Sequence, residues 1–153
     1  MKTKFVRDVM KIGVPTCELD TKLHEVAKIM MRDQADVVVV MDEVGACGII
    51  SQSDLVRAFP RNYELLTAKD VMTTDRVVSI PPDSALTAAA QIMQDEKVHQ
   101  VFVMHEHPGA GKPSAVVTMQ AIVREMAGLE PEKPPALKKL EQAAAARQVA
   151  KKK

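Results

Sequence analysis

The chain repeats itself, and this repeat constrains the fold more than any other feature. Four blocks in the first half recur in the same order in the second half. The paired blocks are VRDVM (6–10) and AKDVM (68–72), LHEVAKIM (23–30) and LTAAAQIM (86–93), ADVVVVMD (35–42) and VHQVFVMH (98–105), and GIISQSDLVRAF (48–59) and AVVTMQAIVREM (115–126). Four ordered matches predict a duplicated structural unit.

Each copy predicts the same order of elements. A short extended segment precedes a helix whose apolar residues recur at helical spacing. An apolar run rich in Val follows, at 37–40 and at 101–103, which is typical of a strand buried on both faces. A second strand and a second helix complete a β-α-β-β-α unit, and Gly128 is expected just after the last helix. The N-caps expected for the first helix of each copy are Asp20 or Thr21, and Ser84.

The two copies are expected to form one mixed α/β fold. A single unit of about 60 residues buries too little surface to be comfortably stable. The units at 1–66 and 67–129 should therefore pack sheet on sheet about a pseudo-two-fold axis. The core should be aliphatic, because aromatic residues make up 3% of the chain and Trp is absent. The axis would produce two equivalent clefts, each lined by both copies.

Composition argues against several classes of protein. A net charge of +1 does not indicate nucleic acid as a partner. Cys17 and Cys47 lack the spacing of a metal site and look like buried thiols of a reduced compartment. We find neither a signal-peptide pattern nor an apolar stretch long enough to span a membrane. We therefore expect a cytoplasmic protein with no membrane partner.

The last segment, 130–153, differs from the repeats. It opens with a Pro-rich spacer and continues into an Ala-rich, basic stretch, with seven Lys or Arg against three Glu and a net charge of +4. Such a tail is typical of a solvated helix that frays or is partly disordered. The alternative is an arm that binds a separate, acidic protein partner.

The stretch GIISQSD (48–54) joins a strand to a helix and has two interpretations. Ser51 followed three residues later by Asp54 resembles a capping box, and an acid at this place faces the positive end of the helix dipole. The second copy has Thr118 but replaces the acid with Ala121, although the residues that follow still look helical. Because the helix does not need the acid, Asp54 is a candidate for binding a ligand.

Residues 4–128 resemble tandem CBS domains, the regulatory modules named after cystathionine beta-synthase. The resemblance rests on VMTTDRVVSIPPDSALTAAAQIM (71–93), VHQVFVM (98–104) and the G-h-h-[S/T]-x-x-D pattern at 48–54. It implies a disc-like pair of units that often forms a homodimer, and a module that senses and does not catalyse. The implied ligand contains adenosine: AMP, ADP or ATP, or alternatively S-adenosylmethionine or NAD, with no cofactor required.

In this family the acid of the motif holds the ribose hydroxyls, which implies that role for Asp54. A carboxylate can accept both hydroxyls of a diol, and free amides at a helix start suit a phosphate. Ala121 removes the acid from the second cleft, so we predict one competent site per chain. The residues expected in the competent cleft are Ile49, Ile50, Ser51, Asp54, Arg57, Thr73, Val78, His99, Gln100 and Gln120. Those expected in the weaker cleft are Val14, Thr16, Asp36 and Thr118.

Three of these residues have a second interpretation or limit the ligand. His99, which can gain charge at mildly acidic pH, could instead be a structural histidine. Arg57 could be a solvated surface residue. Gln100 is neutral at a position where some family members place a basic residue, which weakens the case for tight binding of a triphosphate.

The sequence contains no recognisable catalytic or metal-binding motif. It lacks GxGxxG, GxxxxGK[ST], HExxH and GxSxG, and the turn His105-Glu106-His107 has no further ligand at the spacing of a defined metal site. Two functions therefore remain. The first is a sensor of an adenosine-containing ligand. The alternative is a constitutive interaction or dimerisation module with vestigial clefts and the basic tail as its handle.

Overall fold

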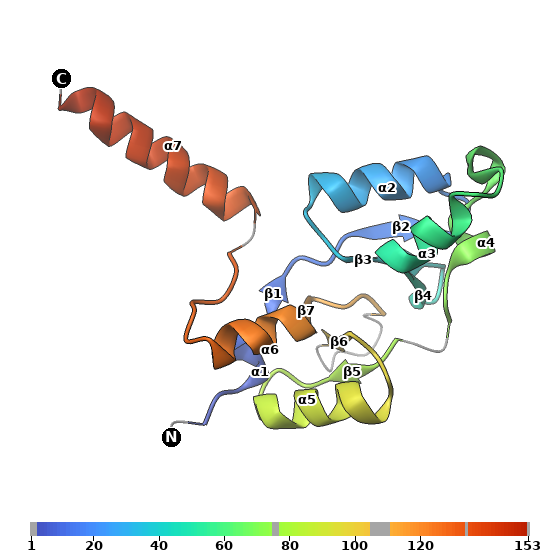
Figure 1. Cartoon of the computed structure of the whole chain (residues 1–153), viewed down its shortest axis with the longest axis horizontal. Helices are drawn as coiled ribbons and strands as arrows, with labels where there is room; N and C mark the ends of the chain where they lie inside the picture. The colour runs from blue at the N-terminus through green and yellow to red at the C-terminus, as the bar shows by residue number, and fades with distance from the viewer. Residues whose placement is uncertain (1–2, 75–76, 105–110, 134, 153) are drawn as a thin grey trace.

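The computed structural model has two β-sheets that pack against each other, with helices on their outer faces (Figure 1). It describes residues 3–74, 77–104, 111–133 and 135–152. A C-terminal helix extends away from this body (Figure 1). The predicted mixed α/β fold, two units packed through their sheets, is confirmed.

The first copy forms a three-stranded sheet in the order β2-β3-β4. Its elements are α1 (Val6–Val9), β1 (Lys11–Ile12), β2 (Thr16–Glu18), α2 (Leu23–Arg32), β3 (Val37–Met41), β4 (Ala46–Ser51) and α3 (Gln52–Ala58). β2 and β3 are parallel, whereas β3 and β4 are antiparallel. A short 3-10 helix, η1 (Tyr63–Leu65), leads into the second copy.

The second copy repeats this arrangement in a four-stranded sheet with the order β1-β7-β6-β5. Its own elements are α4 (Ala68–Val71), β5 (Ser79–Ile80), α5 (Leu86–Asp95), β6 (Gln100–Val103), β7 (Ala115–Thr118) and α6 (Met119–Met126). β5 and β6 are parallel, and β6 and β7 are antiparallel. The fourth strand, β1, comes from the first copy.

Each copy lends its first residues to the sheet of the other copy, which the sequence analysis did not predict. In β1, Lys11 pairs with Val116 of β7. In the second copy, Thr73 pairs with Ile49 of β4 through two backbone hydrogen bonds of 2.9 and 3.0 Å. The boundary between residues 66 and 67 therefore separates the repeats in sequence, but both sheets contain residues from both sides of it.

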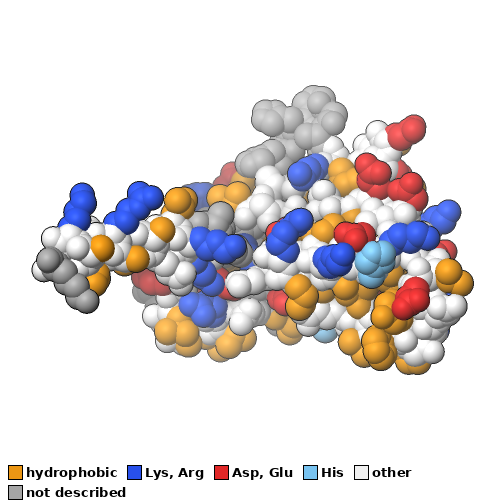
Figure 2. Space-filling model, turned by 90° about the horizontal axis from the view of Figure 1, so that it is seen from above, with side chains coloured by type: hydrophobic (Ala, Val, Ile, Leu, Met, Phe, Trp, Pro, Cys, Tyr) orange, Lys and Arg blue, Asp and Glu red, His pale blue; other side chains and the backbone are white. Residues whose placement is uncertain are grey.

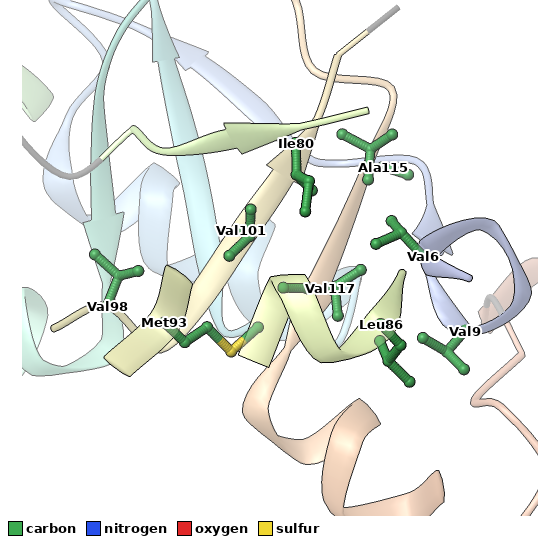
Figure 3. Close-up of a cluster of buried hydrophobic side chains, with 11 residues drawn as sticks. Val6, Val9, Ile80, Leu86, Met93, Val98, Val101, Ala115 and Val117 are labelled. Atoms are coloured by element: carbon green, nitrogen blue, oxygen red, sulfur yellow. The ribbon is translucent and has the colours of Figure 1, made fainter. Parts of the chain in front are cut away.

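The short helix at the start of each copy also crosses over. Figure 3 shows Val6 and Val9 of α1 beside Leu86 of α5, within the hydrophobic core of the second copy. Ala68 of α4 lies correspondingly in the core of the first copy, with Val26 and Met30 of α2. The two cores are therefore completed by each other's N-terminal helices.

A third hydrophobic cluster lies between the two sheets. Its buried members are Val14, Val37, Val39, Ile49, Phe102 and Val116. The alternate residues of β3, Val38 and Val40, belong instead to the cluster under α2. Both faces of β3 are buried, which confirms the prediction from its unbroken apolar run.

The predicted N-caps of the two long helices are wrong. The first residues of α2 and α5 are Leu23 and Leu86, and neither helix has a capping hydrogen bond from a side chain. Backbone carbonyls of the crossing segments serve instead: Leu23 N–H donates to Leu66 at 3.0 Å and Leu86 N–H donates to Lys4 at 2.9 Å. Since these amides are satisfied by the main chain, no side-chain cap is needed. The residues predicted to cap them were Asp20, Thr21 and Ser84.

Helix α6 ends just before Gly128, as the sequence predicts. Gly128 follows the C-cap of α6 with a φ of 70°, a conformation that glycine adopts without strain. Its N–H donates to the carbonyl of Glu125 at 3.0 Å, and the N–H of Leu129 donates to that of Arg124 at 2.9 Å. This pair of bonds is the Schellman motif, and it turns the chain into the spacer before the tail.

The basic tail forms a helix, α7 (Pro135–Lys151), that projects from the body (Figure 1). Its described side chains are almost all exposed. Within the described ranges, none of the helices combines the length and the apolar character that a membrane span requires.

We expect the cluster between the sheets to hold the two copies together. Val39→Ala should lower the free energy of unfolding by about 2–3 kcal/mol, because it removes two buried methyl groups and leaves a cavity. The matched control is Val44→Ala, at a position that is 91% exposed, which should change it by less than about 0.5 kcal/mol. Urea unfolding followed by circular dichroism measures both, and equal effects would contradict this assignment.

Candidate functional site

Asp54 is the acid of a capping box at the start of α3. Its Oδ2 accepts hydrogen bonds from the backbone N–H of Ser51 at 2.8 Å and from the Ser51 hydroxyl at 2.9 Å. Its Oδ1 accepts one from Nη1 of Arg57 at 3.2 Å. Among the residues that the structure describes, Asp54 is the one charged residue that is buried, with 8% of its surface exposed. The capping interpretation is therefore correct, and a ligand role needs support of its own.

The other N-caps of the chain supply part of that support. In the second copy, Thr118 Oγ1 accepts a hydrogen bond from the N–H of Ala121 at 3.2 Å, and α6 forms without the acid. Thr67 and Asp70 form a complete capping box at α4, but there Asp70 is exposed. The backbone N–H and the hydroxyl of Thr67 lower the pKa of Asp70. A cap thus requires neither an acid nor its burial, and burying a charge costs free energy.

The second cleft contains a well-defined cavity. A volume of 270 Å³ lies between the copies, beside Thr118 and Ala121. Val14 and Asp36 of the first copy line it together with Thr118, so three of the four residues predicted for this cleft meet there. Both copies contribute to the lining, as the pseudo-two-fold axis predicts.

Because the chain is a repeat, each residue that lines this cavity has a counterpart in the other copy, and these counterparts can be compared with the residues predicted for the first cleft. Strand pairing aligns the copies independently of sequence, since Lys11 opposite Val116 corresponds to Thr73 opposite Ile49. Eight residues predicted for the first cleft occupy positions whose counterparts line the cavity. The pairs are Ile49 and Val116, Ser51 and Thr118, Asp54 and Ala121, Arg57 and Arg124, Thr73 and Lys11, Val78 and Pro15, His99 and Asp36, and Gln100 and Val37.

Two predicted residues are placed differently by the structure. Gln120 lines the second cleft and not the first, because it lies on the first turn of α6 next to Thr118. Thr16 lies within β2 opposite Val39 and outside the lining of the cavity. The correction for Thr16 has a simple cause: the cleft opens before β2 begins, at Val14.

Ile49 and Ile50, also predicted for the first cleft, have little exposed surface. Ile49 is buried between the sheets, and Ile50 is buried under the helices of the first copy. The backbone N–H and carbonyl of Ile49 are bonded to Thr73.

The sequence analysis missed the charged residues at the second cleft. Lys11, Arg124, Glu132, Lys133 and Lys138 all line the cavity. The last three belong to the tail, for which the sequence predicts a solvated helix or an arm that binds a partner. Arg124 carried a usable signal, because it occupies the repeat position of Arg57. No pattern in the sequence indicates that the spacer returns to the cleft, because this placement depends on contacts between distant residues.

Among the described residues, other reactive groups do not form a site. Burial, with smaller contributions from Cys47 and Glu18, raises the pKa of Cys17 to about 11, and a protonated thiol is a weak nucleophile. Across the described ranges, no group of three or more His, Cys, Asp or Glu is placed to hold a metal ion. The residues His105, Glu106 and His107 lie outside the described part of the chain.

The fold is a duplicated β-α-β-β-α module with a cavity between its two copies. A family model of the CBS domain matches residues 6–61 and again 68–128. The chain therefore belongs to the CBS-domain family and carries two such domains in tandem.

Solved structures share this fold. The CBS domain pair of protein MJ0100, determined in complex with 5-methylthioadenosine and S-adenosyl-L-methionine, aligns with a TM-score of 0.72 at 23% identity, over 83% of this chain and 98% of that one. The CBS-domain containing protein ATU1752 from Agrobacterium tumefaciens aligns with a TM-score of 0.67 at 22% identity, over 80% of this chain and 98% of that one. At these identities the likeness establishes the fold.

Curated relatives match a part of their own length. One, named "Probable arabinose 5-phosphate isomerase", from Haemophilus influenzae, is 30% identical over 104 residues, which are 66% of this chain and 31% of the relative. The homoserine O-acetyltransferase of Methanosalsum zhilinae is 28% identical over 103 residues, 67% of this chain and 20% of the relative. The chain thus spans less than a third of either curated relative.

If Asp54 is buried for a reason other than stability, it should contribute to the free energy of unfolding about as much as Asp70, the exposed acid of an equivalent capping box. Asp54→Ala and Asp70→Ala should each lower the free energy of unfolding by about 1 kcal/mol, because each leaves a helix N-terminus without its acid. Urea unfolding measures both values. A loss above about 3 kcal/mol for Asp54→Ala alone would mean that its burial serves stability, and would remove the argument for a second role.

Proposed function

We propose that this CBS-domain pair is a regulatory module that binds an adenosine-containing ligand in the cleft of Asp54. The observation that carries this proposal is a buried carboxylate at a helix start, where the equivalent helix of the second copy forms without one. The Asp54 carboxylate already accepts three hydrogen bonds. Two carboxylate oxygens offer about four acceptor sites, and Oδ1 can accept a further donor from a ribose diol.

The neighbouring residues favour a small number of phosphates. Arg57 lies one turn after Asp54 with most of its side chain exposed, so it can turn toward a phosphate at little cost. His99 and Gln100 would face the sugar or the phosphates from the second copy. With one His and one neutral amide there, AMP or ADP is favoured over ATP. The complex of the MJ0100 domain pair contains two adenosine compounds, which agrees with this ligand class and keeps S-adenosylmethionine as an alternative.

We also propose that the module acts as a homodimer through its helix faces. Met31 of α2 and Phe59, just after α3, are exposed and line an apolar groove with Leu55 and Tyr63. Covering such a surface would remove apolar area from water. Phe59→Glu should therefore convert a dimer into a monomer in analytical ultracentrifugation, whereas Val44→Glu should leave it unchanged. A monomeric wild-type protein would contradict the dimer.

The proposed ligand class can be tested with a thermal-shift panel. AMP, ADP, ATP, NAD, S-adenosylmethionine and GTP would be added at millimolar concentration to the wild type, Asp54→Ala and Asp70→Ala. A ligand at 100 times its Kd should add about 2.7 kcal/mol of stability. We expect a shift with an adenosine compound in the wild type and in Asp70→Ala, and none in Asp54→Ala.

The opposite result would favour the interaction-module alternative. If no compound shifts a cooperative unfolding transition, the Asp54 carboxylate is a helix cap alone. If Asp54→Ala retains the full shift, the ligand binds elsewhere. In either case the basic tail becomes the first place to look for a partner.

A further inference from the structure

The spacer before α7 returns to the body at the second cleft. Arg124 of α6 holds the carbonyl oxygen of Glu130 with two hydrogen bonds, from Nη2 at 2.9 Å and from Nε at 3.2 Å. Two residues further on, Glu132 lines the cavity and accepts a hydrogen bond from Nζ of Lys138 at 3.1 Å. Figure 2 shows Lys and Arg side chains gathered where the tail meets the body. The chain's own carboxylate thus lies in the cleft that lost its acid.

Glu132 is surrounded by cationic side chains, as a bound anion would be. Partial burial acts to raise the pKa of Glu132, but the hydrogen bond from Lys138 and the positive charges of Lys11 and Arg124 outweigh it, so the pKa is lowered. Lys11 and Arg124 belong to the body and come from opposite copies. The cavity therefore provides its own cations to a negatively charged group, whichever molecule carries that group.

Comparison of the two copies shows that the equivalent arginines, Arg57 and Arg124, have different partners. In the first copy, Arg57 pairs with the acid one turn before it, Asp54. In the second copy that acid is Ala121, and Arg124 instead binds the carbonyl of Glu130. The second cleft also has Lys11 at the position of Thr73 and Asp36 at the position of His99. The body therefore places two cations, Lys11 and Arg124, in a cleft that lacks an acid at the position of Asp54, and such a pair suits a phosphate group.

We infer that Glu132 is an internal ligand of the second cleft, where its carboxylate occupies the position of a phosphate and must leave before a nucleoside monophosphate can bind. This inference extends the proposed function to the second cleft. The incoming phosphate would contact Lys11 and Arg124, and Asp36, a carboxylate in the same lining, would accept sugar hydroxyls. Asp33 also lines the cavity but is paired with Arg32 at 3.0 Å.

Displacement of Glu132 would couple ligand binding to the tail. Helix α7 begins three residues after Glu132, and Lys138 of that helix is bonded to the Glu132 carboxylate. The spacer itself is bonded to the body through the carbonyl of Glu130. The competition lowers the apparent affinity of the second cleft in proportion to the fraction of molecules in which the spacer is released. Ligand binding and release of α7 are then one equilibrium, which gives the module an output that a partner can detect.

NMR spectroscopy of the full chain tests this inference. AMP and inorganic phosphate would be titrated while the amide signals of Thr118, Gln120 and Ala121 report the second cleft, and those of Ser51 and Asp54 report the first. The variants are Glu132→Gln, which removes the charge, and Glu132→Ala, which also removes the hydrogen bond. The control is Glu25→Gln, which removes an exposed carboxylate of α2 paired with Lys28, away from the cavity. Heteronuclear NOE values of residues 130–133 report the order of the spacer.

The expected result has two parts. Both Glu132 variants should bind AMP at the second cleft at least tenfold more tightly than the wild type, whereas Glu25→Gln should match the wild type. Saturating AMP should lower the NOE values of residues 130–133 in the wild type, a response that a purely structural contact would not give.

Two results would overturn the inference. One is equal affinity of wild type and Glu132 variants at the second cleft, including no binding in any of them. The other is AMP binding with an unchanged spacer. Failure of the proposed function is read separately, from the signals of Ser51 and Asp54 in the same titrations.

Discussion

The packing of the two sheets against each other is the contact on which the rest of the structure depends. Val39 and Phe102 occupy equivalent strand positions of the two copies and meet in one buried cluster. Neither sheet could bury its inner face alone. The same contact creates the clefts, because each cleft is the space left where the strand ends of one copy approach the first residues of the other. Stability of the fold and the existence of a site therefore have a common origin.

Exchange of the N-terminal segments makes this contact specific. β1 extends the sheet of the second copy, and Thr73 bonds to the sheet of the first. The crossing segments also provide the carbonyls that accept the first amides of α2 and α5. A residue such as Lys11 consequently lies at the cleft between the copies, although it belongs to the sequence of the first copy and to the sheet of the second.

The two clefts have diverged within this symmetric frame. The first keeps a buried acid, Asp54, paired with Arg57. The second has Ala121 in its place, so that Arg124 binds the spacer and the cavity receives Glu132. One substitution thus changes which groups satisfy a neighbouring arginine, and it allows the tail to become part of the site. The clefts would then differ in kind: the first is suited to a ribose diol and the second to an anion.

Sequence reasoning predicted the burial of β3 and the end of α6, because each depends on a local pattern. It failed where a backbone partner came from elsewhere in the chain. The backbone carbonyls of Leu66 and Lys4 accept the bonds that side-chain caps were expected to accept at α2 and α5. A local sequence pattern cannot predict a carbonyl partner from a distant part of the chain. Gln120 was assigned to the wrong cleft because the sequence does not show on which side of the axis a helix start lies.

The sequence by itself determined the duplicated unit, the alternation of helix and strand, and the loss of one acid between Asp54 and Ala121. These properties follow from periodicity and residue type, both of which can be read directly from the sequence. The tertiary structure alone decided which segment completes which sheet, and that Glu132 returns to the second cleft beside Lys11 and Arg124. The reason is physical: such placements follow from contacts between residues far apart in the sequence, such as Lys4 and Glu125, and their free energy belongs to the packed chain as a whole.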